Sequence, residues 1–222
     1  MEKPRHPKGL YVLFFTEMWE RFGFYTMLAI FTLYLDEYFH FASPGAIYGG
    51  YLAVVYFTPI AGGWVAARLL GFRKTIFLGA ILLAMGYGLL AVKFPETSSV
   101  EQSVAAAEQA HAQAVADWQA RGAAAAQAGQ PFSEPTPEYE GPGRTAGRPL
   151  FFVALLLLVC GNGLFKPNIS VMVGNLYEDG NPLKDSAFNI FYMGINIGAF
   201  FAPLAAAALR NTMGWWWAFA AA

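Results

Sequence analysis

Charge is scarce in this chain of 222 residues, since only 13% of them are Asp, Glu, Lys or Arg, whereas an ordinary soluble domain carries about 25%. The formal net charge of -1 lacks the basic excess that a nucleic-acid partner requires, so we expect no such partner. The single cysteine, Cys160, excludes an intrachain disulfide and is expected to be a packing residue. The sequence shows no nucleophile–base pair and no metal-ligand spacing, so we expect neither an enzyme nor a bound metal.

Long apolar segments dominate the rest of the sequence. Hydrophobic residues make up 56% of the chain. A helix needs about 20 apolar residues to cross a hydrocarbon core of about 30 Å, and lipid offers the backbone no other hydrogen-bond partners. Five segments are long enough: 10–36, 46–69, 74–93, 149–173 and 186–209. We therefore predict an all-α polytopic membrane protein in a lipid bilayer.

A sixth apolar segment begins near Trp215 and reaches Ala222, which is too short to cross a membrane. We therefore expect the chain to be a piece of a longer reading frame, with a truncated product as the alternative. The predicted division has three parts. Residues 1–94 hold three helices, residues 95–148 form an insert, and residues 149–222 hold two helices and the start of another.

The distribution of Lys and Arg predicts how the helices run through the membrane, because these residues accumulate in cytoplasmic loops. The N-terminal tail and the link near residue 70 are basic, whereas the loop over residues 36–43 has no Lys or Arg. The basic residues are Lys3, Arg5, Lys8, Arg68, Arg73 and Lys74. Arg144 and Arg148, beside the fourth segment, argue for the opposite direction. We predict a multi-pass protein of the inner (plasma) membrane with a cytoplasmic N-terminus.

The insert at residues 95–148 differs in composition and, on this orientation, is extracytoplasmic. Residues 100–130 are rich in Ala, Gln and Glu, which are good helix formers, and predict a pair of polar helices. Residues 131–149 are rich in Pro and Gly and predict an extended linker. We find no site chemistry in the insert, and expect His111 and Trp118 to be surface or packing residues.

Three charged residues interrupt the first apolar segment. Each charge near the bilayer centre costs on the order of 3 kcal/mol, so Glu17, Glu20 and Arg21 must face protein or water. On a helix they share one stripe, and Glu17 and Arg21 are four residues apart, which lets their side chains pair. The structural alternative is a buried ion pair that only fixes helix packing. Two acids with one base, however, leave one charge without a partner.

Lys166 supplies a second positive charge, in the fourth segment, and balances the two acids. A lysine inside the membrane usually marks an ion or substrate path, and we expect Glu17 or Glu20 to be its partner. The following residue, Pro167, is expected to bend or unwind the helix locally.

Two further polar residues lie inside predicted spans. Tyr56 in the second segment and Asn196 in the fifth each have two interpretations, a wall of a binding site or a packing residue, and the sequence leaves both open. The pair Gly62-Gly63 is typical of close helix packing.

These residues together resemble four signatures of the proton-dependent oligopeptide transporters (POT/PTR), a branch of the major facilitator superfamily. The signatures occur in order on successive predicted helices, and outside them little besides the insert remains. The matching runs are Glu17-x-x-Glu20-Arg21-Phe22, then Gly62-Gly63 with Arg68, Gly71 and Lys74, then Gly161-x-Gly163-x-x-Lys166-Pro167-Asn168-x-Ser170, and Phe191-Tyr192-x-x-Ile195-Asn196-x-Gly198-Ala199.

The resemblance implies the N-terminal half of such a transporter: the N-terminal six-helix bundle of the major facilitator fold, truncated at the start of helix six. A C-terminal helical bundle is then expected as its partner. The implied function is proton-coupled symport of di/tripeptides by alternating access, with protons as the coupling ion and no other cofactor. The implied proton-coupling residues are Glu17, Glu20 and Lys166. The implied substrate-binding residues are Arg21, Tyr25, Tyr56, Lys166 and Asn196.

Two positions depart from the family's pattern. Phe24 stands where the first of two paired tyrosines is usual, so one substrate contact is in doubt, and Ala67 stands where an acid usually precedes the loop arginine, Arg68. The alternatives to peptide symport are the same fold carrying nitrate or another small anion, and a truncated membrane fragment that does not transport.

Overall fold

The structure is a computed structural model that describes residues 5–222, so Lys3 of the basic tail lies outside the described residues. This part of the chain is mostly helical and contains no strand, as the sequence predicts. The long helices are α1 (Lys8–Leu33), α2 (Pro44–Val65), α3 (Phe72–Leu90), α4 (Ser98–Gln127), α5 (Arg148–Gly174) and α6 (Lys184–Met213). The short elements are α7 (Trp215–Ala221) and two π-helical turns, η1 (Tyr34–Tyr38) and η2 (Ala66–Leu70), which continue α1 and α2.

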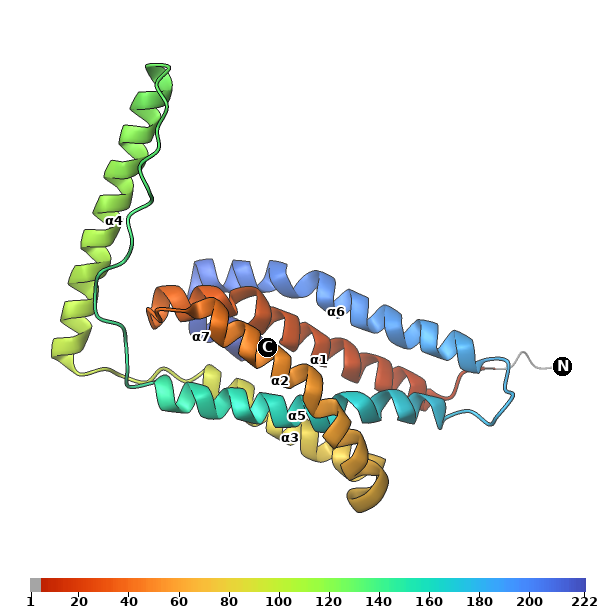
Figure 1. The fold of residues 1–222 in the computed structure, drawn as a ribbon. Helices are drawn as coiled ribbons and strands as arrows, with labels where there is room; N and C mark the ends of the chain where they lie inside the picture. Colours follow the sequence, from red (N-terminus) through yellow and green to blue (C-terminus); the bar gives the residue numbers. More distant parts are fainter. Residues whose placement is uncertain (1–4) are drawn as a thin grey trace.

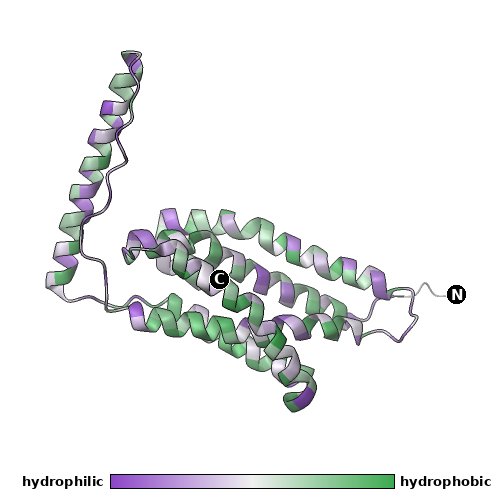
Figure 2. Cartoon of the chain, in the orientation of Figure 1, coloured by the Kyte–Doolittle hydropathy of each residue, from purple (hydrophilic) through white to green (hydrophobic). Residues whose placement is uncertain are grey.

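Five of the long helices form a bundle, and α4 projects from one end of it (Figure 1). The most extensive contacts join α1 to α6 and α3 to α5, and α2 also packs along α5. Helix α1 begins at the end of the bundle opposite to α4 (Figure 1). Hydrophobic residues predominate on the bundle helices, whereas the projecting arm alternates between hydrophilic and hydrophobic residues (Figure 2).

Four helical segments are long and apolar enough to cross a membrane by length and composition: Pro44–Leu70, Phe72–Leu90, Arg148–Gly174 and Lys184–Met213. These confirm four of the five predicted spans. Helix α1, with 26 residues, is not among them. Its charged stripe lowers the local hydropathy. The first predicted span, residues 10–36, therefore stays a prediction. Helix α5 continues through Pro167 without a break.

Glycines let α2 and α5 approach each other closely. A Cβ on Gly62 would overlap the carbonyl oxygen of Gly163, so only a glycine fits there. Thr58 beside them donates a hydrogen bond to the Val159 carbonyl at 3.3 Å, and thereby joins the two helices. Gly63, the other member of the expected pair, has no heavy atom nearer to such a Cβ than Pro167 Cβ at 4.0 Å. Of the two, only Gly62 is therefore required by packing.

The insert forms a single helix with an extended return, and the predicted pair of helices was wrong. Residues 98–127 make the one helix α4, and the chain from Gln130 runs back beside it (Figure 1). Trp118 packs on Phe132 and donates to the carbonyl of Glu134 at 2.9 Å. The extended segment therefore covers the helix face that a second helix would have covered. His111 and Trp118 are packing residues, since His111 meets the edge of Tyr139.

The base of this arm is held by a polar cluster at the end of the bundle. Arg144 bonds to Glu108 at 2.8 Å and to the Tyr38 carbonyl at 3.2 Å. His40 lies 3.3 Å from the same Glu108 carboxylate, and its ring stacks on Tyr139. Glu108 therefore links the arm to the loop that follows η1.

Acid is expected to release the base of the arm. Burial raises the pKa of Glu108, but hydrogen bonds from Arg144 and His40 outweigh it, so the pKa lies below its ordinary value of 4.5. A carboxylate with a lowered folded-state pKa stabilises the fold above its unfolded pKa and loses that contribution as the pH falls through the folded value. Hydrogen exchange near residue 108, corrected for the intrinsic rate, should therefore rise between about pH 5 and pH 3.

The matched variant for this test is Glu108→Gln, in which exchange should already be fast at neutral pH and no longer depend on acid. Glu134→Gln removes the exposed pair with Arg121, 2.9 Å apart, and serves as the control. Acid-dependent exchange that persists in Glu108→Gln would contradict the assignment.

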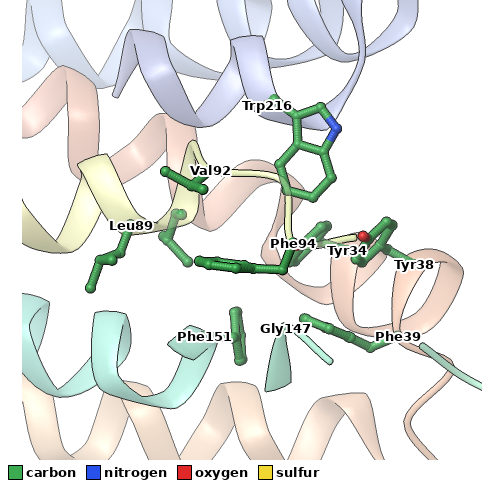
Figure 3. A pocket seen from close by; sticks show the side chains of 10 residues that line it. Tyr34, Tyr38, Phe39, Leu89, Val92, Phe94, Gly147, Phe151 and Trp216 are labelled. Atoms are coloured by element: carbon green, nitrogen blue, oxygen red, sulfur yellow. The ribbon is translucent and has the colours of Figure 1, made fainter. Parts of the chain in front are cut away.

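Aromatic side chains fill the end of the bundle beneath the arm. Figure 3 shows the rings of Tyr34, Phe39, Phe151 and Trp216 converging from three parts of the chain. Tyr34 and Phe39 lie 5.1 Å apart and Phe39 and Phe151 lie 5.3 Å apart between ring centroids. The space left among them is about 10 Å³, which holds about one water molecule. These rings therefore stabilise the bundle end and leave no room for a substrate.

Candidate functional site

Helix α1 carries its charged residues into the interior of the bundle. Glu17 and Arg21 are each only 2% exposed. Arg21 Nε lies 3.3 Å from Glu17 Oε1, the pairing that their spacing predicts. Buried charges persist only when they are paired, so the surroundings of this stripe decide what it can do.

Arg21 pairs more closely with its neighbour Glu20. Arg21 Nη2 donates to Glu20 Oε1 at 2.6 Å, and Arg21 Nε donates to Glu20 Oε2. This bidentate arrangement uses the planar fork of the guanidinium, which is the strongest geometry for an ion pair with a carboxylate. The single guanidinium of Arg21 therefore pairs with both Glu17 and Glu20.

Helix α5 contributes Asn162, whose amide donates to Glu20 Oε1 at 3.3 Å. Sequence reasoning missed this residue. The available signal was its position four residues before Lys166, on the same face of a helix. Asn168, a second buried asparagine of α5, instead donates to backbone carbonyls of Leu164 at 2.6 Å and Gly62 at 3.3 Å.

The expected partner of Lys166 was wrong. Within residues 5–222, no carboxylate lies within 4.0 Å of its ammonium group. Lys166 is half-buried, and its ammonium instead lies over the ring of Tyr56, 5.4 Å from the centroid. Its charge still acts on Glu17, Glu20 and Arg21 across the site.

The other predicted substrate residues lie around this network at different depths. Tyr56 is 61% exposed and Tyr25 is half-buried, with its ring against Phe24. Phe24 stands in place of a tyrosine, and the Arg21 guanidinium lies over its ring, with Cζ 5.0 Å from the ring centroid. Asn196 lies on an exposed face of α6 beside Tyr192, Met193 and Phe200, and within residues 5–222 it forms no hydrogen bond with the charged residues. The structure thus brings Glu17, Glu20 and Arg21 together, places Lys166 beside them and leaves Asn196 apart.

Two buried tyrosines complete the surroundings. Tyr51 of α2 and Tyr87 of α3 are near enough to Glu20 and Arg21 for their charges to interact. Sequence reasoning missed both, because a tyrosine in an apolar run carries no local sign of what it faces.

Two oxygen atoms of the network have no hydrogen-bond partner within the described part of the chain. They are Glu17 Oε2 and Asn162 Oδ1, both fully buried. An unpartnered buried acceptor is unfavourable and usually has a functional reason. No group of three His, Cys, Asp or Glu residues that could hold a metal ion is found among the residues described. The arrangement can hold a proton on a carboxylate and can offer Arg21 to an anionic group.

Comparison with known proteins shows which family this chain resembles. A sequence model of the POT family matches residues 73–222, which is more than half of the chain. The di-/tripeptide transporter of Lactococcus lactis subsp. cremoris is 36% identical over 207 residues, covering 89% of this chain and 31% of that protein. The chain thus spans about a third of the length of the curated relatives it matches.

Solved structures agree with the fold. A crystal structure of peptide transporter POT in complex with sulfate matches with a TM-score of 0.71 at 32% identity, covering 97% of this chain and 35% of that one. A POT family transporter in complex with a thioalcohol conjugated peptide matches with a TM-score of 0.69 at 27% identity, again over 97% and 35% of the two chains. The predicted fold class is therefore confirmed, and the chain belongs to the POT family.

Proposed function

We propose that this chain is part of a proton-coupled symporter of di- and tripeptides. The observation that carries the proposal is a single buried guanidinium shared by two carboxylates, one of which keeps an unpartnered oxygen. The fork of Arg21 matches the planar carboxylate at the C-terminus of a peptide. The di-/tripeptide transporter of L. lactis and the related structure with a bound peptide conjugate support this substrate class.

The charges explain how proton and peptide binding would be coupled. Glu17 and Glu20 balance Arg21 and Lys166, so the cluster is neutral when both acids are ionised. A proton on either carboxylate leaves a net positive cluster, which favours an anionic ligand. The coupling is reciprocal, because a bound peptide carboxylate raises the affinity for the proton by the same factor. Alternating access of the site to the two sides of the membrane would then move both together.

The remaining contacts belong to the same proposal. Lys166 and Arg21 would bind the peptide carboxylate, while Tyr25, Tyr56 and Asn196 would line the peptide. The relatives are about three times as long as this chain, so we propose that a second helical bundle of the complete transporter supplies the opposite wall. The protein would lie in the inner membrane with its N-terminus in the cytoplasm, which places the arm outside.

A small inorganic anion is the second candidate substrate. The same two cations would bind one, and the related POT structure in complex with sulfate supports this alternative. Uptake of labelled dipeptide and uptake of labelled nitrate, measured separately in proteoliposomes, distinguish the two. Uptake of dipeptide alone supports peptide symport, and uptake of nitrate alone supports the anion.

The test of coupling is uptake of labelled dipeptide by proteoliposomes that contain the complete transporter. An inward proton gradient should concentrate peptide in the wild type. Glu17→Gln and Glu20→Gln should abolish that accumulation, because the neutral amide cannot exchange a proton with solvent. Lys166→Ala should also lose coupling, since the cluster would no longer become positive.

The control is Glu37→Gln, at the outer end of η1, where Glu37 pairs with Arg210 away from the cluster. That variant should accumulate peptide as the wild type does. If Glu17→Gln and Glu20→Gln both still concentrate peptide against a gradient, the proton assignment is wrong.

A further inference from the structure

Four side chains form a continuous polar chain through the centre of the bundle. Glu17 contacts Arg21, Arg21 binds Glu20, and Glu20 accepts from Asn162. Each end of this polar chain is a buried oxygen that has no partner among residues 5–222, Glu17 Oε2 at one end and Asn162 Oδ1 at the other. Asn162 is 1% exposed, so bulk water does not satisfy its carbonyl.

The orientation of the Asn162 amide is dictated by Glu20. If the amide were turned round, its carbonyl would face a carboxylate oxygen at 3.3 Å, and two acceptors repel each other. The same argument reverses when Glu20 is protonated, because a carboxylic acid carries a donor. A half-turn about χ2, a torsion with two broad wells, then presents the Asn162 carbonyl to that donor.

We propose that Asn162 is a positioning residue that holds Glu20 in both of its protonation states. When Glu20 is ionised, the Asn162 amide donates to Oε1 beside Arg21. When Glu20 takes a proton, the Asn162 carbonyl accepts from the acid, and Arg21 is released from its bidentate pair to bind an anionic ligand. This inference rests on the proposed proton coupling. It adds the residue that keeps a hydrogen bond to Glu20 both before and after Glu20 takes a proton.

Among the groups around Glu20, Asn162 is the one suited to bond to it in both protonation states. The charged and titratable side chains that act on Glu20 or on its pair are Glu17, Arg21, Lys166, Tyr51 and Tyr87. Lys166 and Arg21 are donors only, and an ionised carboxylate such as Glu17 is an acceptor only. A tyrosine hydroxyl can donate and accept, but among the described residues the only side chains that form hydrogen bonds with Glu20 are Arg21 and Asn162, so neither Tyr51 nor Tyr87 bonds to it. Asn162 offers a donor and an acceptor that exchange by rotation, without any change of its own charge.

The experiment compares two transport modes of the complete transporter in proteoliposomes. Gradient-driven accumulation needs the proton cycle, whereas counterflow exchange of labelled peptide needs only binding and alternating access. Asn162→Leu should lower the ratio of accumulation to counterflow by about tenfold, the factor expected for one hydrogen bond to a charged group. The ratio does not depend on how much protein is folded, so a purely structural role would leave it unchanged.

The matched control is Asn168→Leu on the same helix, where the asparagine is also 1% exposed but bonds only to backbone. Accumulation and counterflow should fall together in that variant. If Asn162→Leu does not fold, Asn162→Ser and Asn162→Ala replace it, because they differ only by a hydroxyl that can donate and accept. The serine variant should have the higher ratio.

Three outcomes are decisive. A wild-type ratio in Asn162→Leu, or equal ratios in the serine and alanine variants, overturns the role of Asn162 and leaves the proposed symport standing. A wild-type protein that exchanges peptide but never accumulates it overturns the proposed coupling, and this inference with it.

Discussion

Replacing Arg21 by Gln is expected to destabilise the folded protein by about 3–5 kcal/mol, the usual cost of removing one partner from a buried ion pair. The loss has a plain cause, since Glu17 and Glu20 would both stay buried with no cation in contact. Lys166 cannot replace Arg21 without leaving the Tyr56 ring. The same change removes the fork proposed to bind the peptide carboxylate, so transport should be lost as well.

Stability and transport separate in a double variant. Glu20→Gln together with Arg21→Gln replaces the bidentate pair by two neutral amides, so the thermal unfolding midpoint should recover part of the loss while uptake stays absent. The measurement is thermal unfolding of purified variants in detergent, beside dipeptide binding. An Arg21→Gln protein as stable as the wild type would mean that the pair contributes nothing to the fold.

Alanine at Gly62 and alanine at Gly63 are expected to change stability in opposite directions. A methyl group at Gly62 meets the Gly163 carbonyl, and forcing α2 away from α5 also breaks the Asn168 bond to the Gly62 carbonyl. Overpacking of this kind costs about 1–3 kcal/mol. At Gly63 the methyl group has room, and exchanging a helical glycine for alanine contributes about 0.5–1 kcal/mol of stability.

The two alanine variants control each other, because they make the same chemical change on adjacent residues of one helix. Unfolding midpoints and yields of folded protein should rank Gly63→Ala at or above the wild type and Gly62→Ala below it. Equal losses at the two positions would show that the α2–α5 contact is not the cause.

The part of the site that was predictable came from local rules. An apolar run of membrane length excludes isolated charges, so the sequence predicted that Glu17, Glu20 and Arg21 share one stripe that faces protein or water. The spacing of four residues predicted the contact between Glu17 and Arg21, which the structure contains at 3.3 Å. The signature runs did the rest, because their order on successive helices resembles one family.

The errors share a cause, which is contact between segments far apart in the sequence. Ala-rich composition correctly predicted helix in the insert, but not that residues from 130 onward would cover α4 as an extended chain. Counting charges predicted a carboxylate partner for Lys166, but did not reveal that Asn162 lies nearer to Glu20. An asparagine carries no charge, so the sequence does not indicate whether its partner is an acid, a base or the backbone.

The sequence by itself determined that the chain is helical, that most of its helices suit a membrane and that the first helix carries a charged stripe. These properties depend on composition and on spacing along one helix. Only the tertiary structure decided which acid holds Arg21 in a bidentate pair, that Asn162 closes the chain and that Lys166 lies over Tyr56. The reason is that partners across helices depend on rotation and depth of α5 against α1 and α2, and close contacts such as Gly62 on Gly163 set both.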